Sequence, residues 1–334
     1  MTEPSLISYS NLSNPVHILA PFHHTRGGDW NMIDVYQHLS SLNQYAIQVW
    51  SPQEPTASYR AHAKIEKISA YSGKFPQGGT FIIGGCTTEI GQWFDHVSFD
   101  KIILIHNEYN PGLLYNYMHR LRFIDRSKIE ICVVGQFVQK ALGIPSKIQP
   151  HYPNSQRFSK LLNIDRSFEI NHKPSRPFTI GKCSRDVLSK HHFRDPALYK
   201  KLRNAGCNIR LLGATCLRPW LDNEAGIELL REQAHSQLAE YLSSVDCFFY
   251  RTCISYKEAF GTVVLEAMLA GLPVVCSRQG GYADLINHGK NGFLFDTDEE
   301  AYELIMQLKN QPKLAKTISQ QARQPIDSKL VHYL

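Results

Sequence analysis

Two glutamates lie eight residues apart in an otherwise apolar stretch of the chain, and they are the residues best suited to chemistry. Glu258 precedes a predicted helix over 260–270, and Glu266 lies about two turns inside it. A carboxylate in a buried helix needs a partner, because removing its charge from water is costly. Two ribose hydroxyls would satisfy Glu266. In a purely structural alternative, Glu266 pairs with a core arginine or lysine and Glu258 caps the helix.

The start of the same helix could bind a diphosphate. Backbone N–H groups in a first helical turn have no intrahelical acceptor, and the helix dipole favours an anion there. Gly261 has no side chain, so a phosphate could approach the backbone closely. Together with Glu266, this segment predicts a site for a nucleotide that carries phosphates.

The segment resembles the E-x7-E signature of retaining GT-B glycosyltransferases, in particular glycosyltransferase family 4. Glu258 and Glu266 stand at the two glutamate positions. The stretches Pro-Val-Val-Cys-Ser-Arg-Gln-Gly-Gly at 273–281 and Asn-His-Gly-Lys-Asn-Gly-Phe-Leu-Phe at 287–295 are similar to the same family. The resemblance is specific over 178–308, whereas the N-terminal half is similar only in pattern.

The resemblance implies a role for each residue of this segment. Glu258 would contact hydroxyls of the donor sugar, and Glu266 would bind the ribose. Peptide N–H groups that follow Glu258 would hold the sugar and the phosphates. In this sequence those residues are Ala259, Phe260, Gly261 and Thr262.

Cations that follow the first strand of the second half would neutralise the donor diphosphate, again by resemblance. Arg185 and Lys190 are the candidates. Lys182 stands where many relatives have arginine, so it is either a substitute in the donor site or a bystander. The alternative for all three is a solvated loop without a ligand.

The N-terminal half offers weaker candidates. Gly27 and Gly28 follow the first predicted strand, where relatives carry a glycine-rich loop that faces the donor phosphates; ordinary turn chemistry is the alternative. His106 ends an apolar strand, at a place where the family often has a functional histidine. A core or turn histidine is the alternative. His23 and His24 are candidates for the acceptor site.

Short apolar runs alternate with helical patterns in both halves, which is typical of parallel sheets covered on both faces. Strands are predicted at 16–20, 46–50, 80–83, 101–105, 130–134, 177–180, 209–213, 245–250, 273–276 and 292–295. Helices are predicted at 30–42, 158–164, 195–205, 236–243 and 260–270. The polar stretch 150–177 interrupts the alternation and is interpreted as the connection between two domains.

The expected fold class is α/β of GT-B type, with two Rossmann-like doubly wound parallel-sheet domains facing a central cleft. We expect an acceptor-side domain over 1–165 and a nucleotide-sugar domain over 166–320. The tail 321–334 could return to the N-terminal domain, as a final helix does in relatives.

Composition narrows the classes of function. The chain of 334 residues has a net charge of +6 but no dense run of Lys and Arg, so nucleic acid is not an expected partner. None of its eight cysteines has CxxC spacing, and Cys132, Cys247 and Cys276 lie in apolar runs typical of buried thiols in a reducing compartment. No apolar run is long enough to span a bilayer. We expect a cytoplasmic protein that could make peripheral contact with the inner face of a membrane.

The expected reaction moves a sugar from a nucleoside diphosphate sugar to a hydroxyl of a glycan or glycolipid, with retention, as in a hexosyltransferase of surface polysaccharide synthesis. No cofactor or metal is expected. The run Asp296-Thr297-Asp298 has the letters of a metal motif but is interpreted as a loop and helix cap. Two alternatives stay open: a catalytically silent GT-B subunit and a nucleotide-sugar epimerase. A nicotinamide dehydrogenase is not supported, since Gly27-Gly28 lacks GxGxxG spacing.

Overall fold

The chain, seen here as a computed structural model, divides into two compact units. Unit 1 spans Met1–Ser155 and unit 2 spans Gln156–His332, so the division lies earlier than the 165/166 boundary expected from the sequence. The structure describes residues 6–9, 11–23, 27–152, 156–165, 176–233 and 237–329.

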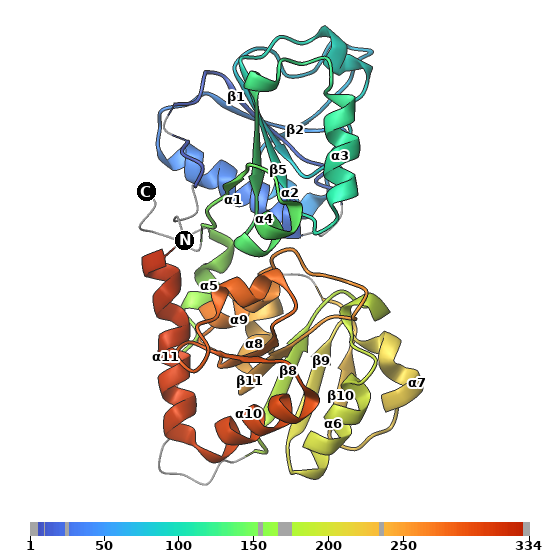
Figure 1. Ribbon diagram of the computed structural model, residues 1–334, viewed down its shortest axis with the longest axis vertical. Helices are drawn as coiled ribbons and strands as arrows, with labels where there is room; N and C mark the ends of the chain where they lie inside the picture. Colours follow the sequence, from blue (N-terminus) through green and yellow to red (C-terminus); the bar gives the residue numbers. More distant parts are fainter. Residues whose placement is uncertain are drawn as a thin grey trace. The chain divides into compact units, whose positions relative to one another are not determined.

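Unit 1 is built on a parallel seven-stranded sheet with the order β3-β2-β1-β4-β5-β6-β7 (Figure 1). The strands are β1 (Val16–Leu19), β2 (Ile47–Ser51), β3 (Ile65–Lys67), β4 (Thr80–Gly84), β5 (Lys101–His106), β6 (Ile129–Val133) and β7 (Lys147–Ile148). The strand order reverses between β1 and β4. In open parallel sheets, ligands bind at such a reversal, beyond the carboxyl ends of the strands.

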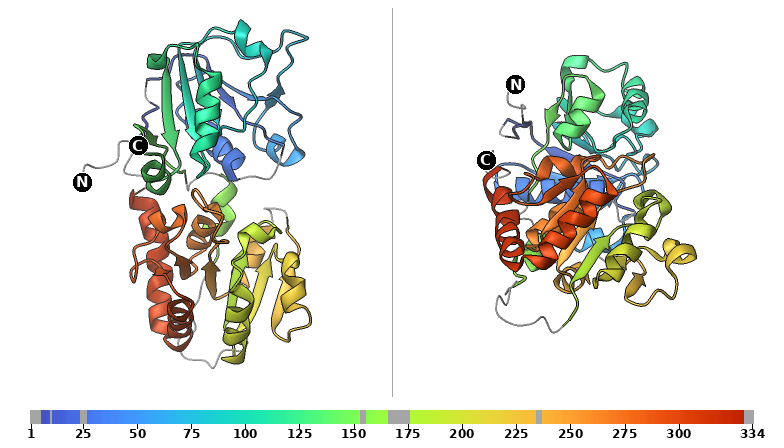
Figure 2. Two further views of the ribbon diagram at one scale, coloured as in Figure 1. Left: turned by 45° about the vertical axis from the view of Figure 1, so that its right-hand side comes forward. Right: turned by 60° about the horizontal axis from the view of Figure 1, so that its bottom comes forward.

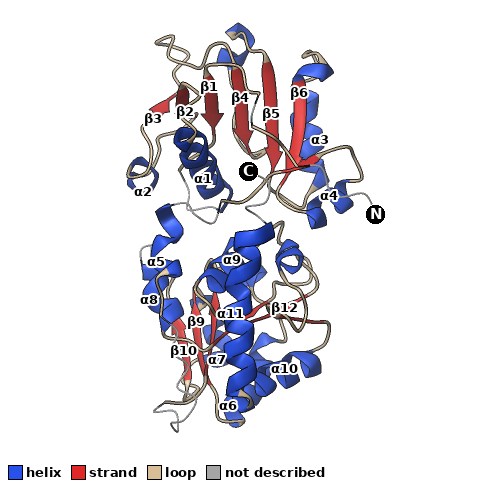
Figure 3. Cartoon of the chain, turned by 90° about the vertical axis from the view of Figure 1, so that its left-hand side faces the viewer, coloured by secondary structure: helices blue, strands red, loops and turns tan. Residues whose placement is uncertain are grey.

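Helices flank the strands of both sheets (Figure 3). In unit 1 they are α1 (Gly27–Ser41), α2 (Ala57–Arg60), α3 (Pro111–Arg120) and α4 (Gln136–Leu142). Local sequence signals explain where several of these helices begin or end. Asn110 caps α3 by accepting from the N–H of Gly112, with Pro111 at the first position. The C-cap of α4 is Gly143, whose φ of 62° is left-handed.

Unit 2 repeats the plan with a parallel six-stranded sheet of order β10-β9-β8-β11-β12-β13. The strands are β8 (Thr179–Cys183), β9 (Asn208–Leu212), β10 (Ile227–Leu230), β11 (Cys247–Tyr250), β12 (Val274–Ser277) and β13 (Phe293–Phe295). Here the order reverses between β8 and β11, so the loops that leave these two strands lie at the place where a ligand is expected.

The helices of unit 2 cover this sheet. They are α5 (Ser159–Leu162), α6 (Asp195–Asn204), α7 (Arg218–Leu221), α8 (Leu238–Ser243), α9 (Thr262–Leu269), α10 (Asp298–Asn310) and α11 (Pro312–Lys329). A buried core holds the layers together. Within it the rings of Phe249 and Phe295 stack at 5.5 Å, and Tyr199 meets Phe249 edge-on at 5.9 Å.

The C-terminal part of the chain stays in unit 2 as far as the structure describes it. Helix α11 packs beside α9 (Figure 2). Residues 330–334, the end of the expected returning tail, lie outside the described residues. No helix in the described part of the chain is both long and apolar enough to cross a bilayer.

Candidate functional site

The predicted site residues of unit 2 follow the two strands at which the strand order reverses. Strand β8 leads into Ser184 and the segment that carries Arg185 and Lys190, and strand β11 leads into Arg251 and the segment that carries Glu258. The strands β8 and β11 are neighbours in the sheet. Two segments far apart in sequence therefore start side by side.

Glu258 lies in a polar cluster at this edge. The hydroxyl of Tyr250 donates to Glu258 Oε2 at 2.9 Å, and the Lys190 ammonium forms an ion pair with the same oxygen. Lys190 Nζ also donates to the Tyr256 hydroxyl at 3.2 Å and lies 4.5 Å from the centre of its ring. The side chains of Lys190 and Glu258 are 8% and 16% exposed, so a largely desolvated, oriented carboxylate faces this edge.

A second loop fixes the backbone of Glu258. The N–H of Gly281 donates to the carbonyl of Glu258 at 2.9 Å. A Cβ atom at Gly281 would lie 1.8 Å from the carbonyl oxygen of Ala259, so only glycine fits here. The Gly-Gly of the 273–281 stretch thus has a structural reason: it lets a loop pack directly on the segment that carries the carboxylate.

Helix α9 begins without a side-chain cap. Its N-cap is Gly261, whose φ of 81° is left-handed, and Thr262 is the first helical residue. Glu258 therefore does not cap this helix. Ala259 and Phe260 are buried, so what this segment offers a ligand is backbone. The first N–H groups of α9 point out of the helix, which is the arrangement that favours an anion.

Glu266 is buried inside α9, as its sequence position predicts, and it has an arginine partner. Its side chain is 5% exposed, and Oε1 accepts from Arg157 Nη1 at 3.2 Å. The structural alternative for Glu266, pairing with a core cation, is thus present in the molecule. A carboxylate has room for further donors, so this pair does not exclude ribose hydroxyls.

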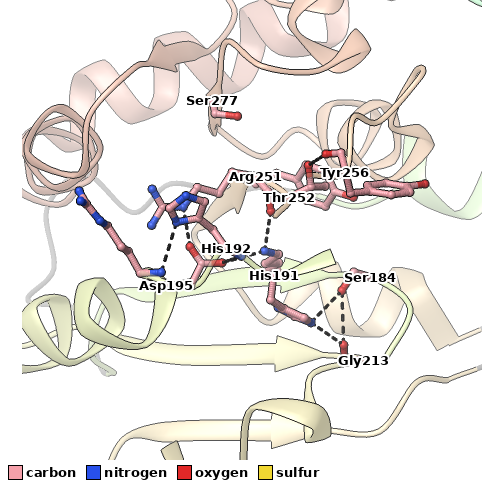
Figure 4. Close-up of polar contacts among 12 residues, drawn as sticks. Ser184, His191, His192, Asp195, Gly213, Arg251, Thr252, Tyr256 and Ser277 are labelled. Atoms are coloured by element: carbon pink, nitrogen blue, oxygen red, sulfur yellow. Dashed lines mark hydrogen bonds and ion pairs between the residues drawn. The ribbon is translucent and has the colours of Figure 1, made fainter. Parts of the chain in front are cut away.

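Lys182 lies inside the domain instead of facing a ligand. It has no exposed surface; its Nζ pairs with Asp195 Oδ2 at 3.1 Å and donates to the carbonyl of Arg251 at 2.7 Å. Asp195 also accepts from Arg251 Nε, at 2.5 Å, and from the N–H of His192, at 3.1 Å (Figure 4). Of the two alternatives, a donor ligand or a bystander, this geometry favours the bystander, because the ammonium of Lys182 is already paired with a buried carboxylate.

Arg185 is exposed, and its guanidinium makes no hydrogen bond or ion pair with the residues that the structure describes. The loop around it is held by its neighbour Ser184 and by His191. The ring Nε2 of His191 lies 3.1 Å from the carbonyl of Gly213 and 3.3 Å from Ser184 Oγ (Figure 4). Burial lowers the pKa of His191 to about 4, so the ring is neutral at pH 7. A fixed loop with an exposed cation suits an anionic ligand.

Unit 1 places its candidates at the ends of β1 and β5. Gly27 and Gly28 open helix α1, and a Cβ atom at Gly28 would lie 1.9 Å from Asn107 Nδ2, so glycine permits this close approach. His106 is fully buried, with Nδ1 3.3 Å from Cys86 Sγ, and burial lowers its pKa to about 4. Its catalytic role stays a prediction.

The other two histidine candidates add little. His23 is half-buried, and His24 lies outside the described residues. Their assignment to an acceptor site therefore rests on the sequence alone.

The Asp-Thr-Asp run proves to be a helix cap, as interpreted from the sequence. Thr297 Oγ1 accepts from the N–H of Glu300 at 3.2 Å, and Glu300 reaches back to the N–H of Thr297 at 3.3 Å, which forms a capping box at the start of α10. Asp298 pairs with Arg251. Among the described side chains, no three of His, Cys, Asp and Glu gather as metal ligands would.

One family model matches part of the chain. Residues 164–325 match the model of the family "Glycosyl transferases group 1". The matched region contains both strands that flank the reversal, both glutamates, Arg185 and Lys190, whereas Arg157 lies before it. The group 1 match therefore falls within unit 2 and includes the segments that carry Glu258 and Glu266.

Curated relatives are similar over parts of their length. N-acetyl-alpha-D-glucosaminyl L-malate synthase of Bacillus anthracis is 36% identical over 92 residues, which are 27% of this chain and 23% of the relative. Trehalose synthase of Pyrococcus horikoshii is 25% identical over 227 residues, 61% of this chain and 54% of the relative. The matched part of the chain thus spans about half, or less, of these relatives.

A solved structure covers almost the whole chain. HepE of Anabaena, in complex with UDP-glucose, superposes with a TM-score of 0.69 over 96% of this chain and 97% of its own, at 14% identity. At that identity the likeness establishes the fold alone. The chain has the GT-B architecture, with two Rossmann-like parallel-sheet domains.

Proposed function

We propose that the protein is a glycosyltransferase that moves a sugar from a nucleoside diphosphate sugar to an acceptor hydroxyl. One observation carries the proposal. Beyond the carboxyl ends of β8 and β11, the desolvated carboxylate of Glu258 is oriented by Lys190 and Tyr250. It lies next to the start of α9, which has no side-chain cap. The match of residues 164–325 to group 1 glycosyl transferases supports it.

Each part of this edge has a role in the proposal. Glu258 accepts hydrogen bonds from hydroxyls of the donor sugar, and Glu266 accepts from the ribose. The start of α9 and the guanidinium of Arg185 receive the diphosphate. As the bond to the sugar lengthens, negative charge grows on the diphosphate, and positive groups already in place stabilise it. Lys190 balances the charge of Glu258. In the proposal it is also one of the positive groups that stabilise the growing negative charge on the diphosphate.

The finer features of the reaction belong to the same proposal. The E-x7-E spacing of Glu258 and Glu266 supports transfer with retention by a family 4 hexosyltransferase, and the cations named above let the chemistry proceed without a metal ion or another cofactor. The proposal also includes a glycan or glycolipid acceptor, a role in surface polysaccharide synthesis and a cytoplasmic location at the inner face of a membrane. UDP-sugars are the first donors to test, because HepE was solved with UDP-glucose.

A thermal-shift screen tests the proposal. The purified protein is melted with UDP, GDP, ADP, CMP and their common sugar conjugates. A ligand that binds only the folded protein raises the melting temperature. We expect a rise with one nucleoside diphosphate and a larger rise with one of its sugar conjugates. No rise with any of them contradicts the proposal and favours a silent subunit. Loss of donor without an acceptor product indicates an epimerase.

Arg185→Ala is expected to weaken binding of the nucleoside diphosphate about tenfold and to leave binding of the free nucleoside unchanged. The reason is that a charge-assisted hydrogen bond to phosphate contributes about 1.5–3 kcal/mol, and about 1.4 kcal/mol is a factor of ten. Isothermal titration with UDP and uridine measures both affinities. Arg218→Ala, at an exposed arginine on α7, is the matched control. Equal losses for UDP and uridine would remove Arg185 from the phosphate site.

A further inference from the structure

Glu266 is paired with an arginine that lies outside its own helix. Arg157 belongs to a short 3-10 helix, Gln156–Phe158, at the start of unit 2. Its guanidinium reaches Glu266 Oε1 at 3.2 Å, and both side chains are 5% exposed. The guanidinium carbon also lies 3.9 Å from the centre of the Phe158 ring. The pair is therefore buried, and the guanidinium is held between a carboxylate and an aromatic face.

The segment that carries Arg157 is itself fixed to the helices of unit 2. Helix α5, which follows Phe158 directly, packs on α9. The side chains of Phe158 and Leu161 are buried. Further along, the carbonyl of Ile164 accepts from Arg323 Nη2 at 2.6 Å, and Arg323 lies on α11. Because the segment is anchored on both α9 and α11, Arg157 approaches Glu266 from a defined direction.

We propose that Arg157 is a positioning residue for ribose recognition: it neutralises Glu266 and sets the orientation in which that carboxylate accepts from the ribose hydroxyls. This inference rests on the proposed function, in which Glu266 is the ribose ligand. A planar guanidinium fixes the direction of a carboxylate better than an ammonium does. A carboxylate offers about four lone-pair sites, so Glu266 can hold Arg157 and accept from hydroxyls at once.

The inference predicts a specific change in nucleotide selectivity when Arg157 is replaced. If Arg157 acts through Glu266, its loss weakens the contact with the sugar hydroxyls and leaves the base and phosphate contacts intact. The quantity to measure is therefore the ratio of affinities for a ribonucleotide and its 2′-deoxy counterpart. General damage to the domain would weaken both ligands together and would leave the ratio unchanged.

The experiment measures dissociation constants for UDP, GDP and ADP and for their 2′-deoxy forms. The wild-type protein should prefer one ribonucleotide over its 2′-deoxy form by about tenfold, the effect of one hydrogen bond to a charged acceptor. In Arg157→Gln the ratio should fall close to one, and Arg157→Lys should restore part of it. Glu266→Gln should lower the ratio equally, and the double substitution should lower it no further.

A matched control and four contradicting outcomes complete the test. Arg176→Gln breaks another arginine ion pair of unit 2, the one with Asp246, and should keep the ratio. If the wild type binds none of the nucleotides, the proposed function fails. If it binds a ribonucleotide and its 2′-deoxy form equally, the ribose role of Glu266 fails. If the wild type discriminates and Arg157→Gln still does, the role of Arg157 alone is overturned. Should Arg157→Gln not fold, an undiminished ratio in Arg157→Lys overturns that role.

Discussion

Glu258→Gln is expected to lower kcat/KM for sugar transfer at least a hundredfold, with little change in the affinity for the free nucleoside diphosphate. The substitution keeps the size of the side chain but removes the charge that receives the hydroxyl of Tyr250 and the ammonium of Lys190. Losing one preorganised electrostatic group from an active site lowers the rate by roughly 10²–10³. Transfer assays with the donor found in the thermal-shift screen, and titration with the nucleotide alone, measure the two quantities.

The matched control for this experiment is Glu299→Gln, at an exposed glutamate in the first turn of α10. It removes the same charge from the same unit without touching the site. Both variants should melt as folded proteins. Full transfer activity in a folded Glu258→Gln protein would show that this carboxylate does not contact the reacting sugar, and the assignment of the site would have to be abandoned.

The sheet strands could be predicted from sequence where they are buried on both faces. The runs 81–83 and 102–105 are continuous and apolar, and the structure confirms the strands predicted there, at 80–83 and 101–105, as β4 and β5. The strands β3, β7 and β10 could not be predicted. They lie at the sheet edges, and each contains at least one charged residue, so no continuous apolar run marks them. Several helices, among them α3 and α11, also went unpredicted.

The sequence and the resemblance could name Glu258, Glu266, Arg185 and Lys190, but they could not show which side chains contact one another. The spacing of Glu258, just before α9, and Glu266, inside it, marks both residues. Their partners come from far away: Lys190 is 68 residues from Glu258, and Arg157 is 109 residues from Glu266. Only tertiary packing brings such residues together, so no pattern within one segment of the sequence predicts their contact. Tyr250 carries one signal in hindsight, because it ends a strand at the reversal of the sheet.

Lys182 shows why residue type misleads at a central strand. A lysine after an apolar run is usually exposed, and a cation there suggests a ligand. Strand β8, however, lies inside the sheet and is covered on both faces, so Lys182 points into the domain. Burying its charge is possible because Asp195, at the start of α6, lies against it. The ion pair that compensates for burying this charge needs Asp195, thirteen residues further along the chain, so it cannot be deduced from the sequence of the strand.

Asp195→Asn is expected to lower the free energy of unfolding by about 3–5 kcal/mol, the usual effect of breaking a buried ion pair by removing one partner. Asp195 contacts two cations, Lys182 and Arg251, and the side chains of Asp195 and Lys182 are fully buried. The variant leaves the fully buried Lys182 without a charged partner, and Arg251 keeps only its pair with Asp298. Urea denaturation, with unit 2 followed separately from unit 1, measures the loss. Glu224→Gln, which breaks an exposed pair with Lys200, should change stability by less than about 1 kcal/mol.

The same network predicts how this difference depends on pH. Burial alone would raise the pKa of Asp195, but Lys182 and Arg251 outweigh it and hold the pKa of this carboxyl below its usual range. A carboxyl with a lowered pKa stabilises the fold fully above its unfolded pKa of about 4, and this stabilisation is lost as the pH falls through the folded value. The gap between wild type and Asp195→Asn should therefore be constant from pH 7 to about 5 and shrink in stronger acid. A gap that stays constant into strong acid would mean that the carboxylate charge is not its source.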